Sequence, residues 1–237
     1  MFSFADGSTM GTMTRTSMLT RLGLMAGLAV VIVAIAVVAA GSGGGGSSDG
    51  GSTATVRSEL QGIPQSGIAL GSPKAPVTMV EFADLQCPFC AQYEREVFPT
   101  ILKRYVRTGK VRLELRLLRF IGPDSDKLAR VAAAASEQDR MWQFVALAYQ
   151  RQGRENSGYA TSEFINKLAA DAGLKRTSAG VAAEQQVRRS EQAAKTLGID
   201  STPSFLIGPT GGPYRRLVPN DLTPGSFIPA IQQELRG

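Results

Sequence analysis

Cys87 and Cys90 are the residues of this chain whose type and spacing can do chemistry. They form a CxxC motif after residues 77–82 (VTMVEF), an apolar, β-rich segment that predicts a buried strand. Pro88 suits the first position of a helix that follows this strand. Cys87 then lies at the helix N-terminus, where free backbone N–H groups and the helix dipole stabilise a thiolate. This arrangement predicts a redox pair with Cys87 as nucleophile and Cys90, one turn inward, as resolving thiol.

The composition excludes most other chemistries. The chain has no histidine, which excludes a Ser-His-Asp triad, a Cys-His pair and a His-ligated metal. No third cysteine is available for a four-cysteine zinc site or a further disulfide. Two alternatives stay open, namely a disulfide that only staples the fold and a two-cysteine copper(I) site. We expect no metal and no diffusible cofactor.

The segments around the motif predict how it is held. Apolar residues recur at helical spacing from Phe89 to Tyr105, which predicts a helix running on to Gly109 with a kink at Pro99. Residues 111–120 alternate between apolar and polar, which predicts a second strand with one wetter face. Because a helix joins the two strands, we expect them to be parallel.

The second half of the chain is predicted to be mostly helical. Residues 124–197 are Ala-rich, and residues 204–207 and 214–218 predict two short antiparallel strands. Thr223 is expected to cap a last helix. The expected interruptions of the helical block are Gly153, Gly173 and Gly180. The overall order of elements indicates the α/β class.

The N-terminal segment is predicted to be a targeting segment rather than a part of the folded domain. Residues 22–40 are uninterrupted apolar residues, enough at about 1.5 Å per residue to cross a hydrocarbon core. Arg15 and Arg21 precede this run and no basic residue follows until Arg57, which places residues 1–21 in the cytosol and exports the rest. A cleaved signal peptide and a buried core helix are the alternatives to a transmembrane anchor.

A linker is expected between the anchor and the folded domain. Residues 41–66 begin with a Gly/Ser-rich stretch, which predicts a flexible tether, with a short helix allowed at its end. The folded domain is then expected over residues 67–237. The net charge of +6 suits either an ordinary solvated surface or contact with anionic membranes and acidic clients.

Two segments carry a family resemblance. Residues 71–105, which include CPFC, resemble the active-site region of DsbA-like proteins of the thioredoxin superfamily. Residues 198–207 (GIDSTPSFLI) resemble the cis-proline segment of the same family. The helical block, about residues 123–197, resembles its inserted helical domain. The resemblance implies a thioredoxin-like α/β fold with a helical insertion, preceded here by one transmembrane helix and a flexible linker.

The resemblance also implies roles for single residues at the redox pair. Cys87 would be the exposed attacking thiolate and Cys90 the buried thiol. Pro203 would be the cis-proline facing both sulfurs, although an ordinary trans proline opening a strand is the alternative. Thr202 would offer backbone groups to an extended client peptide. Three residues are therefore expected to bind substrate or tune the thiolate: Thr202, Pro88 and Phe89.

Glu81 matches the family's buried acid beneath the cysteines. There it would carry a proton to or from Cys90. The alternatives are a strand glutamate that reaches solvent, or Asp84 in the same role.

Phe89 is a departure from the family's best-known oxidant, which has histidine between its cysteines. A protonated histidine would stabilise the Cys87 thiolate, and phenylalanine cannot. We therefore expect a weaker oxidant than that archetype and a higher pKa for Cys87.

The resemblance and the predicted export together imply an oxidase of exported proteins, although the motif alone does not give the direction of electron flow. The domain is expected to lie outside the cytoplasm on a single-pass anchor in a bacterial cell membrane, and to form disulfides in clients with free thiols. A quinone-linked thiol oxidase of the membrane is the expected partner, with no nucleic acid bound and the protein a monomer. A disulfide reductase or isomerase, and a non-catalytic chaperone-like module, are the alternatives.

Overall fold

The computed structural model describes residues 48–119 and 121–237. The predicted cytosolic tail, residues 1–21, and the predicted anchor, residues 22–40, lie outside the described residues. Over the described ranges, no helix has both the length and the apolar character needed to span a bilayer.

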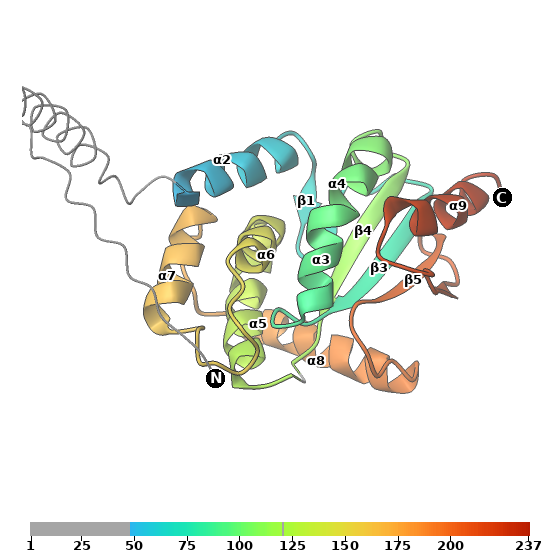
Figure 1. Cartoon of the computed structure of the whole chain (residues 1–237). Helices are drawn as coiled ribbons and strands as arrows, with labels where there is room; N and C mark the ends of the chain where they lie inside the picture. The colour runs from blue at the N-terminus through green and yellow to red at the C-terminus, as the bar shows by residue number, and fades with distance from the viewer. Residues whose placement is uncertain (1–47, 120) are drawn as a thin grey trace, which may run out of the picture. The chain divides into compact units, whose positions relative to one another are not determined.

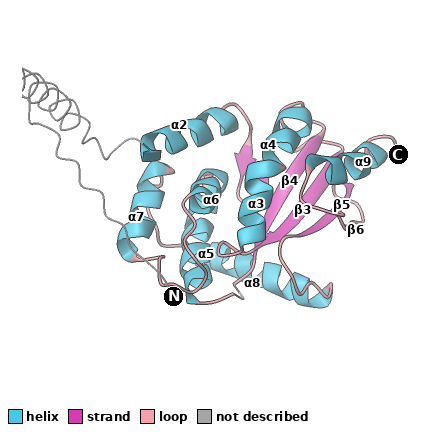
Figure 2. Ribbon diagram, viewed as in Figure 1, coloured by secondary structure: helices cyan, strands magenta, loops and turns pink. Residues whose placement is uncertain are grey.

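A mixed sheet forms the centre of the domain, with its strands in the order β1-β2-β4-β3-β5-β6. Figure 2 shows β4, β3, β5 and β6 of this sheet. The central strand β3 is parallel to β4 and antiparallel to β5, and β5 is antiparallel to β6, as predicted. The short pair β1 and β2, at the far edge, was not predicted, because two-residue strands are too short to show a period. The strands are β1 Gln65–Ser66, β2 Ala69–Leu70, β3 Val77–Ala83, β4 Val111–Leu117, β5 Ser204–Pro209 and β6 Arg215–Leu217.

Helices cover the sheet (Figure 1). Several of their breaks lie at the proline and glycines that were expected to interrupt them. The predicted kink is present: α3 ends just before Val97 and α4 carries Pro99. Gly180 lies at the N-cap of α8, and Gly173 follows α7 with a φ of 77°. The helices are α2 Ser48–Leu60, α3 Pro88–Glu96, α4 Phe98–Ile101, the π-helix η1 Leu102–Val106, α5 Pro123–Ser136, α6 Met141–Gln150, α7 Ser162–Asp171, α8 Val181–Thr196 and α9 Pro224–Glu234.

Strand β3 is buried along its whole length because both faces of the sheet are covered. Its alternate residues Met79 and Ala83 belong to the main core, together with α3 and α6. Val80 and Phe82 point the other way, into a smaller cluster with residues of α8 and β5. Glu81 follows the direction of Met79 and Ala83, so the strand period places its carboxyl on the side of α3.

Three aromatic rings tie α3, β5 and α9 together. The ring of Tyr93 lies 4.8 Å from that of Phe205 and 5.4 Å from that of Phe227, and Phe205 and Phe227 are 5.0 Å apart. All three side chains are almost completely buried. This cluster fixes α3, and with it the CxxC motif, on the sheet.

The predicted linker, residues 41–66, is wrong over its second part. Residues 48–60 form α2, and Val56 and Leu60, at 2% and 5% exposure, belong to the main core. Arg107 donates hydrogen bonds to the carbonyl oxygens of Glu59 and Gln61, which holds the end of α2. The Gly/Ser-rich composition of this segment did not predict a helix. Two apolar residues one turn apart are nevertheless enough to bury one face of it.

Leu60→Ala should therefore destabilise the domain by about 2–4 kcal/mol, since it empties a buried site. Chemical denaturation would measure the loss. The exposed neighbour Ser58 supplies a matched control, because Ser58→Ala should change the free energy of unfolding by less than about 0.5 kcal/mol. Equal, small effects of both substitutions would show that α2 does not belong to the cooperative domain.

Candidate active site

The CxxC motif lies at the N-terminus of α3, as predicted. Cys87 is the N-cap residue, with the extended φ of −71° and ψ of 120°, and Pro88 starts the helix. Both cysteines are free thiols. Cys90 is completely buried, as the resemblance implied, but Cys87 is only 4% exposed. The expectation of an exposed Cys87 is therefore wrong, because the segment before β5 covers its sulfur.

The peptide bond between Thr202 and Pro203 is cis, as the resemblance implied. The Cys87 thiol donates to the carbonyl oxygen of Thr202, with 3.2 Å between sulfur and oxygen. The two segments are separated by 115 residues in the sequence. The fold thus brings the nucleophile and the backbone of Thr202 into direct contact.

Hydrogen bonds to Cys87 favour its thiolate. Contact with the Cys90 side chain, and further hydrogen bonds from the Thr202 side chain and the backbone of Cys90 and Phe89, lower the pKa of Cys87 to about 6 against the opposing effect of burial. Burial raises the pKa of Cys90 well above its ordinary value, and the charges of Cys87 and Glu81 add to this. The two thiols of one motif therefore differ in role at neutral pH, with Cys87 ionised and Cys90 protonated.

This difference predicts the pH dependence of alkylation in the reduced protein. The rate at Cys87 should level off above about pH 7 and fall about tenfold per pH unit below its pKa of about 6. Because this pKa is depressed, the thiolate stabilises the fold most above the ordinary thiol pKa, about 8.5, and that contribution is lost as the pH falls through 6. Iodoacetamide labelling with mass spectrometry checks this, and a midpoint near 8.5 would contradict it.

Glu81 is buried beneath the motif, at 6% exposure, so it does not reach solvent freely. Burial raises the pKa of Glu81 well above its ordinary range, and the charges of Glu94 and Cys87 raise it further. Glu94, one turn beyond Cys90 on α3, has its pKa raised to about 8 by burial and by the charge of Glu59. Glu81 is therefore held in its protonated form, and it interacts electrostatically with the sulfurs of both Cys87 and Cys90.

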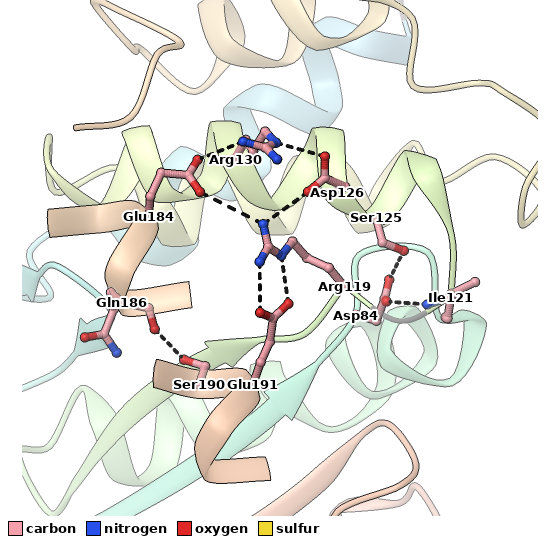
Figure 3. Close-up of polar contacts among 10 residues, drawn as sticks. All are labelled: Asp84, Arg119, Ile121, Ser125, Asp126, Arg130, Glu184, Gln186, Ser190 and Glu191. Atoms are coloured by element: carbon pink, nitrogen blue, oxygen red, sulfur yellow. Dashed lines mark hydrogen bonds and ion pairs between the residues drawn. The ribbon is translucent and has the colours of Figure 1, made fainter. Parts of the chain in front are cut away.

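Asp84 has a different task from the one considered for it. Its carboxyl oxygens accept hydrogen bonds from the hydroxyl of Ser125 at 2.6 Å and the backbone N–H of Ile121 at 3.1 Å (Figure 3). They also accept a hydrogen bond from the backbone N–H of Gln86 at 2.8 Å. Its own carbonyl oxygen accepts from the N–H of Cys87 at 3.0 Å. These bonds occupy the Asp84 carboxyl in holding the turn from β3 to Cys87.

Residues of the helical insertion also hold this turn, and the sequence did not single them out. The side-chain amide of Gln152 donates to the carbonyl oxygens of Leu85 at 3.0 Å and Cys87 at 3.1 Å. The hydroxyl of Tyr149 donates to the carbonyl of Asp84 at 3.3 Å. No local sequence pattern predicts that a glutamine or a tyrosine donates a hydrogen bond to a turn some 65 residues away in the sequence.

An ion-pair network connects the insertion to the end of β4. Arg119 binds both carboxylate oxygens of Glu191, at 2.7 and 2.8 Å, and also pairs with Asp126 at 3.1 Å (Figure 3). Arg130 bridges Asp126 and Glu184 on the same helices. Hydrogen bonding to Glu191 raises the pKa of Arg119. This network fastens α5 and α8 to the sheet, and it contains neither cysteine nor any predicted site residue.

The outer rim of the motif is apolar and open. Pro88 is exposed, and Phe89 is 61% exposed, an unusual position for a large apolar side chain. Thr202 and Pro203 are partly exposed beside them. The three residues expected to bind substrate are thus brought together around Cys87, and Pro203 lies beside them.

Comparison with known proteins agrees with this geometry. Residues 64–211 match the family described as thioredoxin. The probable disulfide bond formation protein D of Bacillus anthracis is 29% identical over 148 residues, which are 59% of this chain and 68% of that protein. The disulfide bond formation protein D of Bacillus subtilis is 26% identical over 180 residues, 71% of this chain and 77% of that protein.

Solved structures share the fold. The crystal structure of oxidised BdbD from Bacillus subtilis has a TM-score of 0.56 and 23% identity, covering 74% of this chain and 98% of that one. A thioredoxin-like oxidoreductase from Silicibacter pomeroyi has a TM-score of 0.58 and 25% identity, covering 76% and 98%. Together with the two free thiols of the CxxC motif, these relatives show that the chain is a protein-disulfide oxidoreductase. By its matched residues and its sheet order, it belongs to the thioredoxin family.

Proposed function

We propose that this protein is a dithiol oxidase that forms disulfides in exported proteins. The low pKa of Cys87 carries the proposal, because a stabilised thiolate stabilises the reduced form and makes the oxidised form a stronger oxidant. A pKa of about 6 lies between about 3.5 for DsbA and about 7 for thioredoxin. It therefore supports an oxidant weaker than the archetype with histidine in place of Phe89. The names of the Bacillus relatives support the same direction.

The proposed cycle starts from a Cys87–Cys90 disulfide. A client thiolate attacks the sulfur of Cys87, which forms a mixed disulfide and releases Cys90 as a thiolate. Cys90 then takes a proton, and Glu81 is the proposed donor. A second client thiolate attacks the client's own sulfur in the mixed disulfide, which forms the client disulfide and releases Cys87 as a thiolate. Two electrons have passed to the enzyme, and we propose a quinone-linked thiol oxidase of the membrane as their acceptor.

The reduction potential tests the direction of electron flow. We expect a value between about −120 mV, the potential of DsbA, and about −270 mV, that of thioredoxin. Equilibration with glutathione buffers would measure it, and trapping with alkylating reagents would show the pair mostly as a disulfide in the cell. A potential at or below that of thioredoxin, with a mostly reduced pair in the cell, would favour a reductase instead.

The proposed location is the outer side of a bacterial cell membrane, with residues 22–40 as a single anchor and residues 1–21 in the cytosol. The basic residues before the apolar run support this orientation. Alkaline phosphatase fused after residue 237 should be active, since that reporter needs export to fold. An inactive fusion, with a cytosolic reporter active at the same position, would contradict the proposal.

A further inference from the structure

We propose that a hollow between η1 and α9 binds a phosphate group, either as the free ion or as the phosphodiester of a lipid headgroup with a net negative charge. The hollow has a volume of about 400 Å³, within the range of about 300–1,000 Å³ that is usual for ligand pockets. The π-helix η1 continues α4, and α9 packs against α4 (Figure 1). Six residues line it: Arg104, Tyr105, Lys110, Gln232, Leu235 and Arg236.

The polar groups of this lining select for an anion. Arg104, Lys110 and Arg236 are exposed cations, and no carboxylate lines the hollow. Within residues 48–119 and 121–237, none of the three cations takes part in an ion pair. The nearby acid on α9, Glu234, is already paired with Arg215 at 2.7 Å. Three cations without a counter-charge around one hollow favour a ligand with at least one negative charge.

Tyr105 adds a second, independent observation. Its side chain is 5% exposed, and its buried hydroxyl has no hydrogen-bond partner in the part of the chain that the structure describes. A buried hydroxyl without a partner is costly, about 1–3 kcal/mol, and such groups are few in native proteins. The Tyr105 side chain lines the hollow, and the guanidinium of Arg104 lies 5.7 Å from the centre of its ring. A ligand oxygen that reached this hydroxyl would satisfy it.

The backbone at this place is also unusual. Residues 102–106 form a π-helix rather than the last turn of an α-helix. Such turns are rare and are often found at functional sites. Here the turn carries both Arg104 and Tyr105, and the backbone N–H of Lys110 donates to the carbonyl of Tyr105 at 2.9 Å. The π-helix thereby brings the three side chains to the same hollow.

Basic residues in a last helical turn also offset the helix dipole, and this is the competing explanation. That effect would account for Arg104 on η1. It would account neither for Lys110 and Arg236, which follow their helices, nor for the Tyr105 hydroxyl. The gathering of three unpaired cations and Tyr105 around one hollow, among the residues that the structure describes, is what favours a ligand.

Calorimetric titration of the full-length chain in neutral detergent tests the proposal at constant ionic strength. The probes are inorganic phosphate, glycerophosphoglycerol as an anionic lipid headgroup, and glycerophosphocholine as a zwitterionic control. We expect binding of phosphate or glycerophosphoglycerol that weakens as salt is added, and no binding of glycerophosphocholine. Binding of phosphate alone identifies the free ion, and binding of glycerophosphoglycerol identifies the headgroup. Absence of binding by both anions would overturn the proposal.

Variants locate the site. The double substitution Lys110→Gln and Arg236→Gln should weaken binding at least about tenfold. The control Lys103→Gln with Lys175→Gln removes the same charge from exposed residues outside the hollow and should change affinity less than about twofold. Tyr105→Phe should weaken binding without lowering the free energy of unfolding, because its hydroxyl has no partner to lose within the described residues. The assignment would be overturned if the two double substitutions weakened binding equally, or if Tyr105→Phe bound the ligand as tightly as the wild type.

Discussion

Replacing Cys87 with serine should reduce disulfide exchange to the rate of the uncatalysed reaction. The chain contains no other cysteine apart from Cys90, which is completely buried and has a raised pKa, so no second nucleophile can take over. Oxidation of a reduced, unfolded ribonuclease by the oxidised protein measures the activity. Exchange above background in Cys87→Ser would show that Cys90 is reachable and that the assignment of the two roles is wrong.

Two substitutions of Cys90 separate its roles as resolving thiol and as hydrogen-bond partner. Cys90→Ser and Cys90→Ala both remove the second sulfur, so both should accumulate mixed disulfides between Cys87 and client proteins. Contact with the Cys90 side chain is the largest influence that lowers the pKa of Cys87. A serine hydroxyl can still donate to the thiolate, and alanine cannot.

The pKa of Cys87 should therefore stay low in Cys90→Ser and rise in Cys90→Ala. The pH profile of alkylation measures both variants in the same way as the wild type, and melting curves show whether they are folded. Equal profiles for the two variants would mean that the Cys90 side chain does not stabilise the thiolate. The Thr202 side chain and the backbone N–H groups would then carry the effect.

Asp84→Ala should destabilise the protein by about 3–5 kcal/mol, the other large effect that the structure predicts. The side chain is completely buried, and its removal leaves the N–H of Gln86, the N–H of Ile121 and the hydroxyl of Ser125 without this acceptor. Because these bonds hold the turn before Cys87, exchange should also slow in the fraction that remains folded. Denaturant unfolding measures the first effect, and stopped-flow reaction with a client measures the second.

Asp84→Asn provides the matched variant. One amide oxygen still accepts from Gln86 and Ser125, but the NH₂ group faces the N–H of Ile121, so one hydrogen bond is lost at a cost of about 1–3 kcal/mol. Glu155→Ala, at an exposed loop residue, should stay within about 0.5 kcal/mol of wild type. If Asp84→Ala cost no more than Glu155→Ala, the hydrogen bonds of Asp84 would not hold the turn.

Much of the fold was predictable because its signals are local. The apolar run of β3, the alternation of β4, the proline after Cys87 and the kink at Pro99 each act over a few residues. The break between α5 and α6 was not predicted, because it rests on the positive φ of 51° at Asp139, which is not a glycine. Thr223 begins α9 as expected, yet its side chain makes no capping bond and donates to Asp221 instead.

The sequence by itself determined that the chain carries two thiols and no histidine, and that the two thiols would lie where a strand passes into a helix. Spacing alone separates Cys87 from Cys90 by one turn, because 3.6 residues of helix make that turn. Only the tertiary structure decided that α2 belongs to the core and that the Asp84 carboxyl holds the turn before Cys87. It also decided that Thr202 covers the sulfur of Cys87 across 115 residues. Such contacts follow from the packing of whole elements against one another, and no short stretch of sequence encodes them.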